Sequence, residues 1–136
     1  MYRYLVRRLT RLTLHRLRAG DPRFLLALMA PDVHFRFLGD HSWAADTHHK
    51  SDVRAWLERY LDARLQLDAH EILVNGPPWN TVVCTRFTDR ATDPDGNVIY
   101  ENEGVLFDRV RWARIREHTA YEDTQRTLEF DRRLRQ

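Results

Sequence analysis

Alternating polar and apolar positions predict three long strands in the second half of the chain. Residues 80–90 (NTVVCTRFTDR) and residues 98–110 alternate in character, and residues 112–122 (WARIREHTAYE) form a third such stretch. The sequence Asp93-Pro94-Asp95-Gly96-Asn97 indicates a turn between the first two, because proline presets its own φ and both glycine and asparagine tolerate positive φ. We therefore expect an antiparallel meander, one face of which needs an apolar cover.

Helical periodicity in the rest of the chain indicates where this cover comes from. Residues 2–18 place leucines on one stripe and arginines on another, which is typical of an amphipathic helix. A short helix is expected at residues 23–29, because an aspartate cap and a proline precede it. Residues 51–65 repeat apolar side chains at i, i+3, i+4 and i+7 and predict the clearest helix. Residues 124–134 indicate either a short arginine-rich helix at the end or a frayed tail.

Two shorter strands are expected at residues 32–38 and 67–75, while residues 39–49 show no period and are expected to form a loop. Because helices precede most of the strands and gather on one face of the sheet, the predicted fold class is α+β. Such an arrangement leaves a conical cavity between the concave face of the sheet and the helices. The length predicts a single domain that spans residues 1–136.

Composition and charge remove several classes of function. The single cysteine, Cys84, excludes an internal disulfide and a zinc site built from cysteines, and it favours a reducing compartment such as the cytoplasm. A net charge of +2 is too small to indicate a nucleic-acid partner. A basic amphipathic helix such as residues 2–18 also occurs on membrane surfaces and in mitochondrial presequences. We expect it instead to pack on the rest of the chain, so no membrane partner is predicted.

Several short segments carry a resemblance to a known family. They are Ala19-Gly20-Asp21, Met29-Ala30-Pro31-Asp32-Val33, Lys50-Ser51-Asp52-Val53-Arg54-Ala55-Trp56, Asp95-Gly96, Tyr100-Glu101-Asn102, Arg114-Ile115-Arg116-Glu117 and Tyr121-Glu122-Asp123. They resemble the SnoaL-like branch of the nuclear transport factor 2 superfamily, whose members include ketosteroid isomerase, scytalone dehydratase, polyketide cyclases and limonene-epoxide hydrolase. The resemblance covers nearly the whole chain. It implies a cone-shaped, curved mixed or antiparallel sheet with N-terminal helices around a pocket, a cystatin-like α+β barrel.

Limonene-epoxide hydrolase allows this resemblance to be compared residue by residue. Its catalytic arginine falls on Arg86, and its two aspartates fall on Thr88 and Ala120. Its water-holding tyrosine and asparagine fall on Phe35 and Phe37. A general base must accept a proton at neutral pH, which threonine and alanine cannot do. Epoxide hydrolysis by that mechanism is therefore not expected.

The same comparison and the two-residue period of a strand predict which side chains line the pocket. The expected residues share the inward face or the mouth of the cone, and they are Phe35, Phe37, Trp43, Cys84, Arg86, Thr88, Tyr100, Asn102, Arg116, His118 and Ala120. Trp43 is expected to cover the mouth. This set combines an aromatic wall with an arginine, an imidazole and an amide.

His118 and Arg86 are the candidate catalytic residues. An imidazole titrates near neutral pH and can give or take a proton, although His118 can equally serve only as a hydrogen-bonding partner. Arg86 can orient an anionic or enolate-like oxygen, or it can form an ion pair with a glutamate of the late strands. Glu122 is the nearest remaining carboxylate for acid–base chemistry, and Asn102 can donate to a carbonyl or to strand backbone. Cys84 is expected to behave as a small hydrophobe.

Neither a metal nor another cofactor is expected. The chain offers His34, His41, His48 and His49 within a short stretch. However, His48 and His49 are adjacent, so they cannot both point one way in an extended segment, and no spacing typical of zinc enzymes accompanies them.

Three functions stay open at this point. The chain can be an acid–base enzyme of the isomerase, cyclase or dehydratase kind that acts on a small hydrophobic or enolisable molecule. It can also be a non-catalytic ligand-binding protein, or a dimeric interaction domain. We expect a homodimer that pairs through the outer face of the sheet, where Val83, Thr85, Phe87, Ile115 and Tyr121 are predicted to form an apolar patch.

Overall fold

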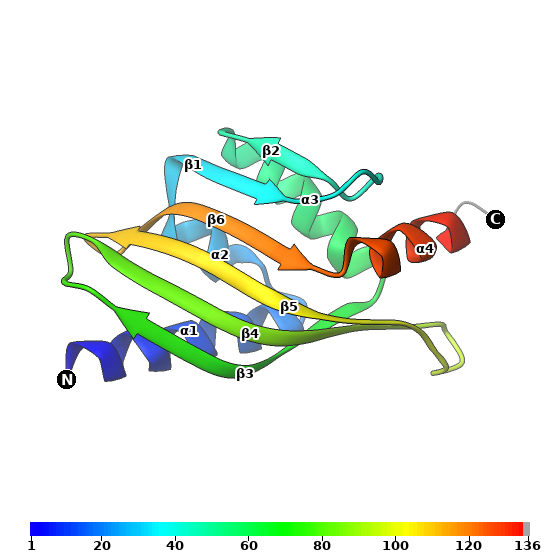
Figure 1. Cartoon of the computed structure of the whole chain (residues 1–136), viewed down its shortest axis with the longest axis horizontal. Helices are drawn as coiled ribbons and strands as arrows, with labels where there is room; N and C mark the ends of the chain where they lie inside the picture. Colours follow the sequence, from blue (N-terminus) through cyan, green and yellow to red (C-terminus); the bar gives the residue numbers. More distant parts are fainter. Residues whose placement is uncertain (135–136) are drawn as a thin grey trace.

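A computed structural model describes residues 1–134, in which a curved sheet wraps around helices that lie along its concave face (Figure 1). The helices are α1 (Tyr2–Arg18), α2 (Arg23–Leu28), α3 (Lys50–Asp62) and α4 (Thr124–Leu134), and the strands are β1 (Met29–Phe37), β2 (Ala45–Thr47), β3 (Leu65–Asn75), β4 (Thr81–Thr92), β5 (Val98–Arg111) and β6 (Arg114–Glu122). The six strands are ordered β2-β1-β6-β5-β4-β3. Among the strand pairs of residues 1–134, β1 with β6 is the only parallel one. The α+β cone expected from the sequence is confirmed.

Local chemistry explains where the main elements begin and end. Helix α1 stops before Gly20, which adopts a φ of +93° that a residue without a Cβ tolerates. The turn between β4 and β5 closes on Asp93, because its Oδ1 accepts hydrogen bonds from the backbone N–H groups of Asp95 and Asn97. Within residues 1–134, no helix is both long and apolar enough to cross a membrane.

Several boundaries differ from the predicted ones: helix α3 ends at Asp62 instead of residue 65, and two larger differences involve β1 and β2. Strand β1 starts at Met29, which the sequence pattern assigned to a helix, because Met29 is already extended and pairs with Ile115 of β6. The segment predicted as a loop contains the short strand β2, which pairs with the end of β1 as a sheet edge. Both differences arise from pairing with distant strands, which local periodicity does not report.

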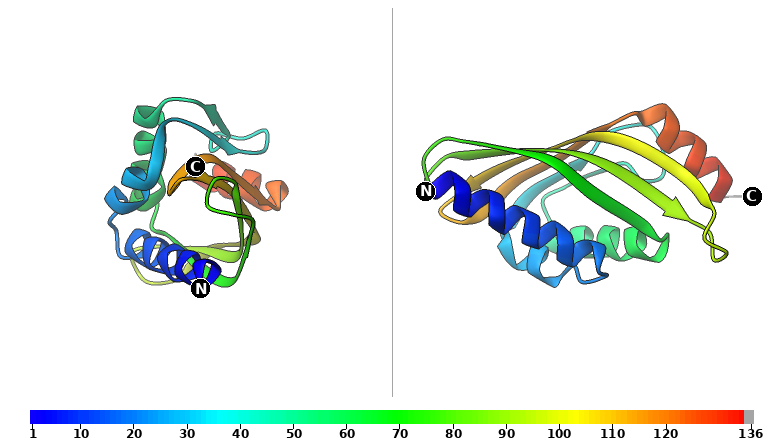
Figure 2. Two further views of the ribbon diagram at one scale, coloured as in Figure 1. Left: turned by 90° about the vertical axis from the view of Figure 1, so that its left-hand side faces the viewer. Right: turned by 90° about the horizontal axis from the view of Figure 1, so that it is seen from below.

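Aromatic residues close one end of the cone. Phe130 of α4 stacks on Tyr100 of β5, with ring centroids 4.4 Å apart, and also lies against Trp43. Trp56 of α3 packs between the rings of Trp43 and Tyr60. The views in Figure 2 place α4 at the opposite end of the molecule from the N-terminus. The closed end is therefore the one that carries α4.

The strand faces are reversed along β4 relative to the prediction. Val83, Thr85 and Phe87 are buried on the concave face, while Arg86 is exposed on the outer one. Burying an unpaired guanidinium is costly, and a shift of one residue moves every side chain of a strand to the other face. The predictions that Arg86 faces the cavity and that Val83, Thr85 and Phe87 form the outer patch are therefore wrong. Ile115 is also buried.

A β-bulge explains why Ile115 is buried. Between β5 and β6 the register shifts, so that Val110 pairs with Ile115 but Arg109 pairs with Glu117. The unpaired Arg116 inverts the alternation on β6. For this reason Ile115 and His118 are both buried although they are three positions apart, and Arg116, predicted to face inward, is exposed.

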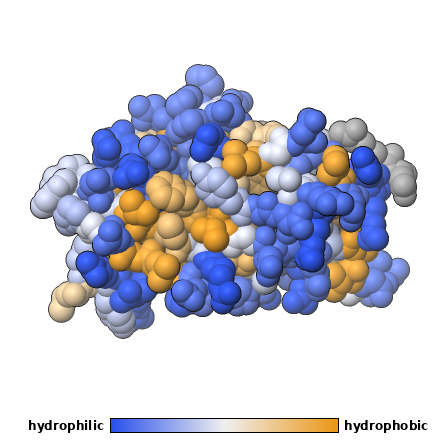
Figure 3. Space-filling view, in the orientation of Figure 1, coloured by the Kyte–Doolittle hydropathy of each residue, from blue (hydrophilic) through white to orange (hydrophobic). Residues whose placement is uncertain are grey.

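The outer face of the sheet carries its own apolar patch. Figure 3 shows apolar side chains gathered over the strands on this face. We define the outer patch as exposed Leu73, Val105 and Tyr121 together with half-buried Cys84 and Phe107. Of the residues predicted for this face, only Tyr121 belongs to it.

Candidate functional site

A cavity of about 500 Å³ lies between α1 and the concave face of β4, β5 and β6. Its walls are mostly aliphatic, and they include Leu9, Leu14, Leu25, Val83, Leu106 and Ile115. The polar groups that line it are few, and they include Thr85, Asp108 and His118. A cavity of this size with an apolar lining and few polar groups is typical of a small-molecule site.

His118 and Asp108 form a hydrogen-bonded pair in the wall of this cavity. They occupy facing positions on β6 and β5, and His118 Nδ1 lies 2.5 Å from Asp108 Oδ1. Each residue is only 9% exposed. Phe35 of β1 stacks on the imidazole with a centroid distance of 5.3 Å. Asp108 thus binds a nitrogen at the edge of the imidazole, and Phe35 packs against the face of the ring.

The surroundings of His118 shift its protonation equilibrium in two opposing ways. Burial disfavours the charged imidazolium, but the negative charge of Asp108 and the hydrogen bond to it favour that form. The charge of Asp108 and the hydrogen bond to it together outweigh burial, so the pKa of His118 is raised above its ordinary value of 6.5. Because Nδ1 is engaged by Asp108, Nε2 is the ring nitrogen available for proton exchange with a ligand.

Thr85 adds a hydroxyl group to the same cavity. Its side chain is completely buried in β4, and among the residues that the structure describes its Oγ1 has no hydrogen-bond partner. A buried hydroxyl without a partner costs stability, and such groups are found where a ligand can complete the hydrogen bonding. Sequence reasoning missed Thr85 because it placed this residue on the outer face.

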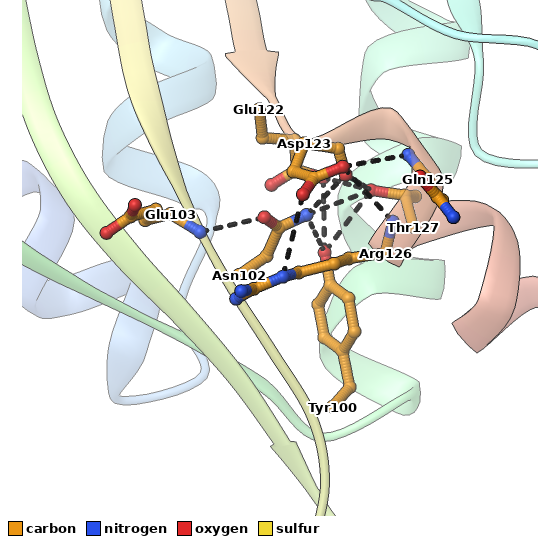
Figure 4. Close-up of polar contacts among 8 residues, drawn as sticks. All are labelled: Tyr100, Asn102, Glu103, Glu122, Asp123, Gln125, Arg126 and Thr127. Atoms are coloured by element: carbon orange, nitrogen blue, oxygen red, sulfur yellow. Dashed lines mark hydrogen bonds and ion pairs between the residues drawn. The ribbon is translucent and has the colours of Figure 1, made fainter.

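A polar network fills the closed end of the cone (Figure 4). Asn102 Nδ2 donates to the Tyr100 hydroxyl at 2.8 Å and to the backbone carbonyl of Asp123 at 2.9 Å. Thr127 Oγ1 donates to Glu122 Oε1 at 2.8 Å. Asn102 and Tyr100, both predicted to bind substrate, are thus engaged in joining β5 to the start of α4.

Two carboxyl groups in this part of the cone have raised pKa values: those of buried Asp89 and of half-buried Glu122, which belongs to the network. Tyr60 donates to Asp89 Oδ1 at 2.8 Å, and burial raises the pKa of Asp89 to about 8. Burial also raises the pKa of Glu122 to about 7. Both carboxyl groups line a small space of about 40 Å³ that His118 borders as well. Sequence reasoning considered Glu122 but not Asp89, which lies on the face of β4 that was assigned to the outside.

The other predicted site residues are divided between the two faces of the sheet. Phe35, Phe37 and Ala120 are buried on the concave side and border the small space beside His118. Cys84 and Thr88 are half-buried on the outer face with Arg86.

Trp43 and Arg116 also lie away from the expected positions. Trp43 is buried at the closed end, with the Arg59 guanidinium 3.9 Å from its ring centroid, so it does not cover the mouth. Arg116 contacts Asp32 on the surface at 3.4 Å. The structure therefore brings together His118, Phe35, Phe37 and Ala120 from the predicted set.

Fold and cavity together define a cone-shaped α+β protein with an apolar internal cavity. The chain belongs to the SnoaL-like domain family, whose model matches residues 10–118. The predicted membership is thereby confirmed. Among curated proteins, no sequence matches the chain.

Solved structures share the fold of this chain. An NTF2-like protein of unknown function from Burkholderia pseudomallei superposes with a TM-score of 0.75 at 18% identity, covering 91% of this chain and 95% of that one. A protein provisionally named a polyketide cyclase from Xanthomonas campestris superposes with a TM-score of 0.66 at 20% identity, covering 95% and 98%. At this level of identity the similarity establishes the fold alone.

Proposed function

We propose that the protein is an acid–base enzyme that moves a proton on a small hydrophobic, enolisable molecule, as isomerases, cyclases and dehydratases do. The observation that carries this proposal is the Asp108–His118 pair in the wall of an apolar cavity of about 500 Å³. A histidine oriented by a carboxylate is a common general acid–base device. The provisional polyketide cyclase name of one relative supports the same reaction class.

The proposed reaction consists of two proton transfers at the cavity wall, with an enolate between them. Neutral His118 accepts a proton at Nε2 from a carbon next to the carbonyl of the substrate, and the electron pair of that C–H bond forms the enolate. Asp108 stabilises the imidazolium that results, and the Thr85 hydroxyl donates to the enolate oxygen. His118 then returns the proton to a different carbon or to oxygen. When no group leaves, no atom is gained or lost and the reaction is an isomerisation. It is a cyclisation when the enolate carbon attacks a second carbonyl whose oxygen takes the proton from His118, and a dehydration when a neighbouring hydroxyl leaves as water with that proton.

Hydrogen–deuterium exchange tests this proposal without knowledge of the natural substrate. The probe is 2-tetralone, an apolar ketone, and the exchange of its α-hydrogens in heavy water is followed by NMR. The wild-type protein is expected to accelerate exchange, and His118→Gln to lower that rate roughly a hundred-fold or more. His49→Gln, a change at an exposed histidine, is the matched control.

Binding is measured in parallel through the fluorescence of Trp112, which lines the cavity. Binding without exchange would identify the chain as a non-catalytic ligand-binding protein. Exchange that persists in His118→Gln would show that another group is the base.

We also propose that two copies pair through the outer patch. Contiguous apolar area of this kind is common at subunit interfaces. The cytoplasmic location expected from the single cysteine stays a prediction.

A further inference from the structure

An apolar stripe runs from the cavity out to the surface along α1. Leu5, Leu9 and Leu12 are 55%, 39% and 43% exposed, and Leu5 and Leu9 also line the cavity. Farther along the helix, Leu14 and Leu17 are buried in the core. Only the later part of α1 therefore packs as the sequence pattern predicted, while its first part borders an opening.

Two tryptophans stand at the same opening. Trp112, in the turn between β5 and β6, lines the cavity although it is 69% exposed, and Trp79 is 58% exposed. Their ring centroids are 6.0 Å apart, and the backbone N–H of Trp112 donates to the carbonyl of Pro78. The hydroxyl groups of Tyr2 and Thr81, 2.6 Å apart, join the start of α1 to this region. Figure 2 shows the N-terminus of α1 beside these turns.

The charge around the opening has one sign. Helix α1 contains six arginines and no aspartate or glutamate. Arg111 and Arg114 flank the turn that carries Trp112. Arg18 pairs with Asp68 at the far end of α1, whereas Arg8 and Arg11 have no carboxylate partner within residues 1–134. Asp108 is the acidic residue that lines the cavity, and it is bonded to His118.

We propose that this opening docks on the surface of a bilayer that contains anionic lipids, so that an apolar ligand passes between bilayer and cavity without crossing water. Exposed leucines and tryptophans at the boundary of the acyl chains, with arginines at the phosphates, are the composition that such surfaces bind. The sequence argued against a membrane partner because the leucine stripe was expected to pack internally. The exposure of Leu5, Leu9 and Leu12 removes that reason. Docking does not depend on the chemistry at His118.

Vesicle co-sedimentation tests the docking surface with the full chain. Vesicles of phosphatidylcholine alone are compared with vesicles of phosphatidylcholine and phosphatidylglycerol. We expect binding to the anionic vesicles and a loss of binding as salt is added. The double variant Arg8→Gln/Arg11→Gln should weaken binding by roughly five-fold for each charge. The matched control, Arg54→Gln/Arg90→Gln, removes two exposed arginines of other elements and should bind as the wild type does.

The apolar contribution is tested by Leu12→Gln/Trp112→Gln, which should weaken binding at every salt concentration. Circular dichroism confirms that each variant is folded. Equal binding to both kinds of vesicle, or equal loss in the two arginine double variants, would overturn the proposal. A wild-type dimer that Leu12→Gln converts to a monomer, with no vesicle binding, would also overturn it and assign the opening to contacts with a second copy.

Discussion

The carboxylate of Asp108 lies 2.5 Å from Nδ1 of His118, on the neighbouring strand, within a wall that is otherwise almost wholly aliphatic. This pairing determines which protonation state of the imidazole the fold favours. It therefore links the chemistry proposed for the cavity to the stability of the protein.

Asp108→Asn should lower the pKa of His118, because it removes the charge that outweighs the effect of burial. The folded-state pKa of His118 in the wild type is raised above 6.5, so the pair contributes stability below that pH, and the contribution is lost as pH rises through the folded-state pKa. Asp108→Asn should therefore destabilise the protein more at a pH of about 5.5 than at about 8.5. Urea unfolding at the two pH values measures the difference.

NMR titration of the His118 ring supplies the direct check on that interpretation. Asp46→Asn, which affects a carboxylate paired with exposed His34, is the matched control and should leave the His118 titration unchanged. An unaltered His118 titration in Asp108→Asn would contradict the assignment.

Asp89→Asn should reduce the loss of stability that occurs as the pH rises from about 4 to about 8. The pKa of Asp89 is raised from 3.8 to about 8, so between these values the folded state holds a proton that the unfolded state has released, and stability falls as pH rises. Asparagine retains an acceptor for Tyr60 without the charge, so the variant should be more stable than the wild type at a pH of about 9, by a few kcal/mol at most. Urea unfolding across this range measures it. Exposed Asp62→Asn is the control, and identical slopes for all three proteins would contradict the prediction.

The sequence predicts the elements of this fold better than the faces of its strands. The alternation along β4 places a valine on each face, as Val82 and Val83, so period alone does not decide which set is buried. Asp89 follows Val83, Thr85 and Phe87 in the two-residue period of β4 and faces inward with them, and its partner Tyr60 is 29 residues away along the chain. On β6, the bulge at Arg116 inverts the period between Ile115 and His118. Long-range pairings of this kind leave no signal in a local pattern.

His118 was identified correctly as an inward residue, but its partner was not. Asp108 sits in β5 among alternating residues, and nothing in the local sequence connects it with a histidine ten positions later. The register of the β5–β6 hairpin places the two residues opposite each other, where they form a hydrogen bond. Regular pairing outward from the turn would place Asp108 opposite Glu117, and only the bulge at Arg116 moves its partner to His118, so the local pattern could not have found the pair.

Thr85→Val should lower the activity of the protein without lowering its stability. Valine has nearly the shape of threonine and removes a buried hydroxyl that lacks a partner within residues 1–134, so stability should be unchanged or rise by about 1 kcal/mol. If Thr85 donates to the enolate, α-hydrogen exchange in 2-tetralone should fall at the same time.

Thr81→Val is the matched control, because Thr81 is equally buried on the same strand but donates to the carbonyl of Pro77. That control should lose about 1 kcal/mol of stability. Wild-type exchange in Thr85→Val would exclude its proposed role.

Val105→Glu should disrupt the proposed homodimer. Val105 is exposed at the centre of the outer patch, where it pairs with Arg86 on one side and Tyr121 on the other. A glutamate there would place two carboxylates in an apolar interface, which costs several kcal/mol, and pairing with Arg86 on the neighbouring strand offsets only part of that cost. Light scattering after size exclusion, at tens of micromolar protein, should give the mass of two chains for the wild type and of one for the variant.

Val98→Glu, a change at an exposed valine beside the turn between β4 and β5, is the matched control and should stay dimeric. A wild-type protein that elutes as a monomer, or a Val105→Glu variant that stays dimeric, would remove the outer patch as the interface.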